Sequence, residues 1–287
     1  MTEVEPTPLP AHLVREAVER TLAEDLGLAG DITSQACLPA AARARVIMAS
    51  RQPGVVSGTQ LAVEAFRQVD SDVAVSIEAR DGSRLSPGDI VLRVEGNARA
   101  VLAAERTALN FMGRMCGTAT LTAAFAEKVR HTKARILDTR KTTPGLRAFE
   151  KYAVRCGGGV NHRFALHDAV LIKDNHVGVA GGIIPALRRA KAQVGPLVKI
   201  EIEVDSLEQL DQVIGEGCDM VLLDNMDLAT LREAVRRVGG RFLTEASGNV
   251  KLDTVAAIAE TGVDFISSGA LTHSAPVLDL GLDIDIT

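Results

Sequence analysis

The second half of the chain alternates short apolar runs with segments of helical periodicity, and this alternation constrains the fold more than any other feature. Residues typical of helix starts, such as Ser206 and Asp227, stand between the runs. Strands that alternate with helices in this way form right-handed βαβ units and a parallel sheet. The predicted strands are 134–139, 169–173, 198–204, 220–224, 241–246 and 264–268, and the predicted helices are 144–156, 183–194, 206–216, 227–238 and 251–261. Six strands are too few to close an eight-stranded barrel, so an open barrel and a doubly wound sheet both fit.

The first half has a different pattern, typical of a small α+β domain. Two further helices with a break at Gly113 and Gly117 are expected to lead from it into the second half. The predicted elements are helices at 11–26, 59–68, 98–115 and 118–130 and strands at 44–50, 73–79 and 90–95. We therefore predict an α/β protein with an N-terminal α+β domain over 1–115 and an α/β barrel domain over 116–287. Roughly the last 14 residues are expected to pack on the N-terminal domain.

The composition of the 287 residues excludes several classes of protein. Hydrophobic residues make up 46%, which is too many for a disordered chain. No apolar run approaches the roughly 20 residues of a membrane-spanning helix, and the acidic, proline-rich start lacks the features of a secretory signal. Aromatic residues make up only 3%, which argues against a base-stacking surface for nucleic acid. The four cysteines form no CxxC pair, which favours reduced thiols in a cytoplasmic protein over a zinc site.

One segment of this acidic chain is basic. The net charge is −5, yet residues 133–176 hold nine Lys or Arg against four Asp or Glu. A local excess of positive charge favours a small anionic ligand over DNA, which usually requires a broadly basic face.

Polar side chains follow each predicted strand of the second half. The C-terminal ends of parallel strands meet at one edge of a sheet, where α/β proteins bind ligands. Arginine and lysine at this edge bind carboxylates and phosphates, although an ion-pair network with Glu203 and Asp224 is the alternative. His162 follows three glycines and adjoins Arg163, which makes it a plausible donor to a carboxylate. The cations expected around the opening are Arg140, Lys141, Arg163 and Lys173.

A carboxylate pair and two glycine segments complete the predicted site. Glu203 and Asp224 lie at neighbouring strand ends, and beside a polyphosphate they suit hydroxyl recognition and a Mg²⁺ ion held largely through water. The paired carboxylates of a hydrolase would have the same spacing, but the cations favour an anionic substrate. Glycine in segments 247–249 and 268–270 lets backbone N–H groups approach a phosphate.

Several long motifs occur in order over nearly the whole chain. They are EDLG at 24–27, GDITS at 30–34, AERTALNFMGRMCGTAT at 104–120, DTRKTTPGLRAFEKYAV at 138–154, CGGGVNHRFALHDAVLIKDNH at 156–176, EIEVDSLEQ at 201–209, LLDN at 222–225, EASGN at 245–249 and SSGALTHS at 267–274. In these motifs the chain resembles the quinolinate phosphoribosyltransferase family, also called nicotinate-nucleotide pyrophosphorylases (carboxylating). The resemblance implies the conversion of quinolinate and phosphoribosyl pyrophosphate, with Mg²⁺, to nicotinate mononucleotide, pyrophosphate and CO₂ in NAD biosynthesis. It also implies an N-terminal open sandwich, a C-terminal open α/β barrel and a homodimer with shared active sites, sometimes assembled further.

The resemblance also implies a role for each matching position. The quinolinate carboxylates would be held by Arg140, His162, Arg163 and Lys173, beside Thr139, with Arg106 reaching in from the neighbouring subunit. Lys141, Glu203 and Asp224 would face phosphoribosyl pyrophosphate and its metal as the catalytic set. The 5′-phosphate would be bound by Ser247, Gly248, Asn249, Ser268, Gly269 and Ala270.

Three other functions remain open from the sequence. A paralogous phosphoribosyltransferase could use another pyridine carboxylate, because pocket shape decides the substrate. An aldolase could use Lys173 as a Schiff-base nucleophile, although the surrounding arginines argue against it. A non-catalytic protein could bind a dicarboxylate, but it would have no use for the acid pair of Glu203 and Asp224.

Overall fold

The computed structural model describes residues 6–286, whose contacts form two compact units. The first comprises residues up to 123 with 144–158 and the segment from 275 onward, and the second comprises 124–143 and 159–274. Each unit is therefore made of separate stretches of the chain, whereas the sequence predicted one boundary between residues 115 and 116. Residues 1–5 and 287 lie outside the described residues. The predicted N-terminal domain begins in residues 1–5, and these residues also contribute to the expectation that the chain has no secretory signal.

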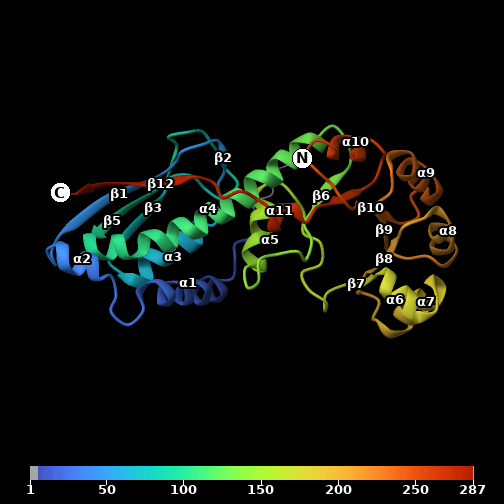
Figure 1. Cartoon of the computed structure of the whole chain (residues 1–287), viewed down its shortest axis with the longest axis horizontal. Coiled ribbons are helices and arrows are strands. Elements are labelled where there is room, and N and C mark those ends of the chain that lie inside the picture. The colour runs from blue at the N-terminus through green and yellow to red at the C-terminus, as the bar shows by residue number, and fades with distance from the viewer. Residues whose placement is uncertain (1–5, 287) are drawn as a thin grey trace. The chain divides into compact units, whose positions relative to one another are not determined.

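The first unit is built on an antiparallel sheet in the order β12-β1-β5-β3 (Figure 1). The final strand of the chain pairs with β1 from Ala44 opposite Ile286 to Ser50 opposite Leu280, so the last residues belong to this unit. The strands are β1 (Arg43–Ser50), β3 (Ala74–Ile77), β5 (Ile90–Asn97) and β12 (Leu280–Ile286), with a separate two-stranded pair, β2 (Gly54–Val55) and β4 (Arg84–Leu85).

Helices gather on one side of this sheet, where their apolar faces form a continuous core (Figure 1). The fully buried side chains of Met48, Leu92 and Phe66 bring together two strands and a helix in that core. Side chains that alternate along a strand place apolar residues on one face, which is why these strands were recognisable in the sequence. The helices are α1 (Ala11–Leu26), α2 (Ile32–Cys37), α3 (Thr59–Val69), α5 (Arg147–Cys156) and the first part of α4 (Ala98–Val129).

Helix α5 belongs to the first unit, although the chain on both sides of it belongs to the second. Two polar contacts hold it there. Buried Glu150 accepts from Arg114 of α4 at 2.7 Å, and the Tyr152 hydroxyl donates to Asp81 at 2.7 Å. A buried ion pair of this kind requires both partners, because either charge alone would be costly to bury.

The predicted break in the helix before the barrel is wrong, because α4 runs without interruption through Gly113 and Gly117. These glycines make room for the segment that leads into β12. A Cβ at position 117 would lie 2.0 Å from the Pro276 carbonyl oxygen, and the Gly113 carbonyl accepts a hydrogen bond from Leu278 N–H at 3.0 Å. The glycines therefore serve close packing with a segment about 160 residues later, not helix termination.

The second unit is a six-stranded parallel sheet in the order β6-β11-β10-β9-β8-β7, a partial α/β barrel (Figure 1). The first two strands of the unit, β6 and β7, lie at opposite edges, so the barrel is open between them. An isolated bridge between Leu137 and Val160 extends the β6 edge. The strands are β6 (Arg135–Leu137), β7 (Val170–Ile172), β8 (Ile200–Val204), β9 (Met220–Asp224), β10 (Leu243–Ser247) and β11 (Phe265–Ser267).

The strand-to-strand connections of the second unit carry short helices. Asp227 caps its helix by accepting from Thr230 N–H, and the Ser206 side chain accepts from Gln209 N–H, as the sequence predicted. The helices are α6 (Asp174–Ala180), α7 (Ile183–Gln193), α8 (Leu207–Glu216), α9 (Leu228–Val238), α10 (Val255–Ala259) and α11 (Ala270–His273).

We predict that Gly117→Ala destabilises the protein. Alanine favours a helix over glycine by about 1 kcal/mol, but the new methyl group would overlap the Pro276 carbonyl and leave a net loss of about 1–3 kcal/mol. Calorimetric unfolding should show a lower midpoint. Gly215→Ala in α8 is the matched control, because a Cβ there meets nothing within 4 Å. A Gly117→Ala protein as stable as the Gly215→Ala protein would contradict this account of α4.

Candidate active site

The C-terminal strand ends of the second unit surround a cavity of about 860 Å³. Parallel strands present their following loops at one edge, and those loops carry the predicted polar residues. Of the predicted site residues, those that line the cavity are Thr139, Arg140, Lys141, His162, Arg163, Lys173, Glu203, Asp224, Ser247, Gly248, Asn249, Ser268, Gly269 and Ala270. The lining residues that the sequence did not assign are Leu171, Leu222, Asn225, Glu245, Val250, Lys251, Ser267 and His273.

Alternation along the strands arranges the cavity in two layers. Asp224 pairs in register with Ser247, and Leu222, one layer deeper, pairs with Glu245 on one side and Glu203 on the other. On β8, Glu201 points to the same side as Glu203 because side chains two residues apart share a face. Charged groups therefore occupy both the mouth and the interior of the sheet.

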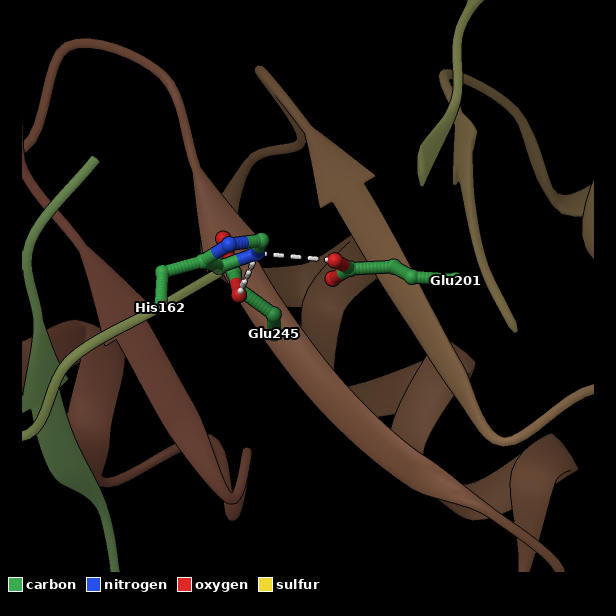
Figure 2. Close-up of side chains that lie close together, drawn as sticks. All are labelled: His162, Glu201 and Glu245. Atoms are coloured by element: carbon green, nitrogen blue, oxygen red, sulfur yellow. Dashed lines mark hydrogen bonds and ion pairs between the residues drawn. The ribbon is translucent and has the colours of Figure 1, made fainter. Parts of the chain in front are cut away.

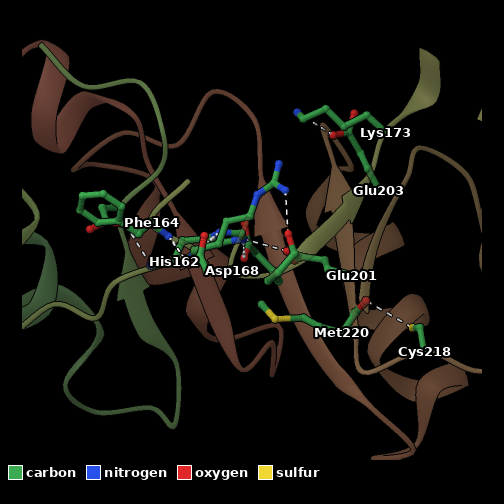
Figure 3. Close-up of polar contacts among 12 residues, drawn as sticks. His162, Phe164, Asp168, Lys173, Glu201, Glu203, Cys218 and Met220 are labelled. Carbon is green, nitrogen blue, oxygen red and sulfur yellow. Dashed lines mark hydrogen bonds and ion pairs between the residues drawn. The ribbon is translucent and has the colours of Figure 1, made fainter. Parts of the chain in front are cut away.

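The cations of the cavity are held by specific contacts. The Lys173 ammonium lies 3.2 Å from Glu203, so part of the expected ion-pair network exists (Figure 3). The Arg163 guanidinium donates to the Ala169 carbonyl at 2.9 Å, and burial together with the nearby Arg140 lowers its pKa. Five Lys or Arg against three Asp or Glu line the cavity, so its charge is not balanced by this pairing.

His162 is engaged at both ring nitrogens. Its Nδ1 accepts from the Arg163 N–H at 2.7 Å, and its Nε2 lies 2.8 Å from a Glu201 oxygen and 3.6 Å from a Glu245 oxygen (Figure 2). Because Nδ1 accepts the backbone N–H, Nε2 is the ring nitrogen that donates toward the glutamates. In this arrangement the His162 ring orients the Arg163 backbone and the buried glutamates. To bind a substrate carboxylate, either ring nitrogen would have to give up its contact with Arg163 or with Glu201.

The two glutamates beside His162 are almost fully buried. The side chains of Glu201 and Glu245 are 8% and 1% exposed, and each has one buried oxygen without a hydrogen-bond partner among the described residues. Burial, reinforced by the Glu201 carboxylate, raises the pKa of Glu245 to about 8. Burial and the neighbouring Glu201 therefore favour the acid form of Glu245, while Glu201 accepts the His162 hydrogen bond.

A buried aspartate shapes the loop that carries His162. Asp138, at the end of β6, accepts from the His162 N–H at 2.9 Å and from the Asn161 side chain at 2.6 Å. The sequence analysis did not assign Asp138, although its place directly before Thr139 at a strand end was a signal for it. These contacts hold the loop that carries Arg163 against the end of β6, which leads into Arg140 and Lys141.

The loop after β10 is tightly built against the loop after β9. Asn225 and Asn249 both have left-handed backbones, with φ of 53° and 50°, and the Asn249 side chain donates to Asn225 at 3.2 Å. Gly248 has φ of 95°, and a Cβ there would lie 2.9 Å from the Asn225 backbone nitrogen. Left-handed turns can direct successive N–H groups toward one point and bind an anion there.

Lys141 lies against the second glycine segment. Its backbone is held at both ends, because its N–H donates to the Thr139 hydroxyl at 3.0 Å and its carbonyl accepts from the Thr272 hydroxyl at 2.7 Å. A Cβ at Gly269 would lie 2.8 Å from Lys141 Cδ, so a larger residue there would require the lysine side chain to move. The lysine is thereby kept at the same end of the cavity as residues 268–270.

The acid pair provides hard oxygen donors. Glu203 and Asp224 come from adjacent strands, and the Asp224 carboxylate accepts from the Asn225 side chain at 2.6 Å. Mg²⁺ prefers such carboxylate oxygens and keeps several waters, so these two residues fit the ion that accompanies a polyphosphate.

Arg106 is the predicted site residue that does not line the cavity. It lies on α4 within the first unit, its side chain is exposed, and no ion pair to Glu105 or another acid is found for it within residues 6–286. An exposed cation that forms no ion pair with any acid of residues 6–286 has room to meet an external anion.

Comparisons with known proteins identify the family. The quinolinate phosphoribosyl transferase models match residues 31–116 for the N-terminal domain and 118–283 for the C-terminal domain. Nicotinate-nucleotide pyrophosphorylase (carboxylating) of Mycobacterium leprae is 46% identical over 275 residues, which cover 94% of this chain and 96% of that protein. A probable nicotinate-nucleotide pyrophosphorylase (carboxylating) of Bacillus subtilis is 38% identical over 277 residues, covering 96% and 95%.

Solved structures agree with this assignment. The nicotinate-nucleotide pyrophosphorylase from Francisella tularensis superposes with a TM-score of 0.92 at 37% identity, covering 98% of this chain and 99% of that one. In residues 6–286 no helix combines the length and apolar character needed to cross a membrane. From its sequence matches and its two-part fold, the chain belongs to the quinolinate phosphoribosyl transferase family.

Proposed function

We propose that this protein transfers the phosphoribosyl group of phosphoribosyl pyrophosphate to quinolinate, giving nicotinate mononucleotide, pyrophosphate and CO₂. One observation carries the proposal: a single cavity holds a set of cations, an acid pair and two glycine-containing loops. Quinolinate requires the cations, the ribose and its metal require the acid pair, and the 5′-phosphate requires the glycine-containing loops. A dicarboxylate-binding protein would need only the cations.

The cations Arg140, Arg163 and Lys173 hold the two carboxylates of quinolinate. Arginine supplies planar forks for a carboxylate, and lysine supplies a point charge. His162 supports this set from beneath, because its ring bonds to the Arg163 N–H and to Glu201. When quinolinate binds, Lys173 gives up part of its contact with Glu203 and contacts a quinolinate carboxylate instead.

Phosphoribosyl pyrophosphate occupies the other end of the cavity. Its 5′-phosphate binds the segments 247–249 and 268–270, and Lys141, whose N–H is held by the Thr139 hydroxyl, meets the pyrophosphate. Glu203 and Asp224 take the ribose hydroxyls and would hold Mg²⁺ when it is bound. The ion supplies charge stabilisation for the pyrophosphate oxygens.

The reaction needs no external base. The quinolinate nitrogen attacks the anomeric carbon as pyrophosphate leaves, and Lys141 stabilises the developing negative charge. Glu203 and Asp224 favour the cation-like sugar by electrostatic attraction. The resulting pyridinium draws electrons from the adjacent ring carbon, whose carboxylate then leaves as CO₂.

The site also draws on a second copy of the chain. In the proposed homodimer, which can assemble further, Arg106 enters the partner's cavity and meets quinolinate, which accounts for its exposure and lack of an ion pair. A cytoplasmic location fits the four free cysteines.

We predict that the purified protein with Mg²⁺ and phosphoribosyl pyrophosphate forms nicotinate mononucleotide and equal amounts of CO₂ from quinolinate. Nicotinate, which has one carboxylate, should be used at least about 100-fold less well in kcat/KM, because cations built for a second carboxylate stay unpaired. Chromatography and CO₂ release from carboxyl-labelled quinolinate give the two readouts. Equal use of the two acids would overturn dicarboxylate recognition, and no turnover of quinolinate would overturn the function.

We predict that Arg106→Ala and Lys173→Ala proteins are each inactive and complement one another when mixed. A heterodimer has one site with both residues intact. Random pairing at equal concentrations should restore roughly a quarter of parental activity, because half the dimers are mixed and each has one good site. Mass spectrometry of differently labelled subunits is the control for exchange. Exchange without recovery would assign Arg106 to its own subunit or to no site.

A further inference from the structure

The proposed reaction has a proton requirement that no residue assigned so far meets. When CO₂ leaves, the bond between ring carbon C2 and the carboxylate breaks, and its electron pair remains on C2. Nicotinate mononucleotide carries hydrogen at that carbon, so a new C2–H bond must form. A proton donor positioned at the carbon accelerates such a step by about 100-fold to 10,000-fold.

Most groups that line the cavity are unsuited to donate this proton. The two arginines do not release a proton near neutral pH. Lys173 Nζ is engaged with Glu203 at 3.2 Å, and His162 Nε2 is engaged with Glu201 at 2.8 Å. The remaining lysines and His273 lie toward the phosphate segments: Lys141 and His273 flank Gly269, and Lys251 follows 247–249.

Glu245 differs from these groups in position and in protonation. It lines the cavity from β10, one layer beneath Ser247, and its neighbour across the strands is the apolar Leu222. One of its oxygens is buried without a hydrogen-bond partner among the described residues. This oxygen, Oε2, lies 3.6 Å from His162 Nε2, too far for a hydrogen bond, and a buried oxygen without one is unfavourable unless a ligand or a reaction uses it.

The groups around Glu245 favour its acid form. Glu201 on β8 contributes negative charge, which opposes a second carboxylate, while His162 and the Ser267 hydroxyl on β11 favour ionisation. Burial raises the pKa of Glu245 more than His162 and Ser267 lower it, because a buried carboxylate loses its solvation. His162 opposes the rise in the pKa of Glu245 electrostatically, and its Nε2 lies at hydrogen-bond distance, 2.8 Å, from Glu201.

We propose that Glu245 is the acid that protonates C2 of the quinolinate-derived ring as CO₂ departs. The inference rests on the proposed function and adds the residue that completes its chemistry. The Glu245 O–H bond breaks, the C2 electron pair takes the proton, and Glu245 is left as a carboxylate beside Glu201. The repulsion between the two carboxylates then returns a proton from solvent to Glu245 before the next turnover.

The test separates phosphoribosyl transfer from decarboxylation in a single turnover. Glu245→Gln keeps the size and neutrality of the side chain but removes its acidic proton. Pyrophosphate formation should stay within about threefold of the parent while CO₂ formation slows by about 100-fold, because an unprotonated carbanion can recapture CO₂. The undecarboxylated mononucleotide should accumulate between the two events.

A second readout identifies the donor directly. In equal parts of H₂O and D₂O, the ratio of hydrogen to deuterium at C2 of the product depends on which group delivers the proton. Glu245→Gln should change this ratio, since water replaces the carboxylic acid. Ser267→Ala is the matched control, because it alters a hydrogen-bond partner of Glu245 and keeps the acid, and it should retain the parental ratio.

The outcomes are distinguishable. Equal losses of pyrophosphate and CO₂ in Glu245→Gln, or an unchanged isotope ratio, would overturn the role of Glu245 while the function stands. A parent that forms neither product would overturn the function itself. If Glu245→Gln fails to fold, Glu245→Asp and Glu245→Asn form an equivalent pair, and only the aspartate should restore rapid CO₂ release.

Discussion

The buried cluster of His162, Glu201 and Glu245 lies beneath a positively charged cavity. Five Lys or Arg line the cavity against three Asp or Glu, and burial together with Glu201 favours the protonated form of Glu245. Were Glu245 ionised, two adjacent carboxylates would lie together in a low-dielectric interior, which is unfavourable. The lining is positive with Glu245 in either form, and a proton on Glu245 adds to the positive balance that a dianionic ligand meets.

The fold makes this arrangement possible in two ways. Parallel strands bring six chain segments to one edge, and their alternation places Glu203 and, two residues earlier, Glu201 on the same face of β8. The open seam between β6 and β7 leaves room for the loop that carries His162 and Arg163, which Asp138 anchors to β6. The site is thus built from loops whose ends are fixed by the sheet.

The sequence predicted the sheet and most of the cavity because both depend on local pattern. Strand–helix alternation located the strand ends, and the polar residues predicted at those ends line one cavity. The continuity of α4 was missed because the reason for Gly117 is a contact with Pro276, which no local pattern reveals. Glu245 stands in the EASGN motif but was given no role, because a buried acid inside a strand has no periodic signature and its pKa depends on Glu201 from another strand.

The central claim is that the cavity recognises a dicarboxylate through oriented guanidinium groups rather than through net charge alone. Calorimetric titration of quinolinate into the parent and into an Arg163→Lys protein tests it directly, because the substitution keeps the charge and removes the planar fork. The account predicts affinity at least about tenfold weaker, since charged hydrogen bonds contribute about 1.5–3 kcal/mol each. Unchanged affinity would contradict it and leave only a diffuse electrostatic attraction.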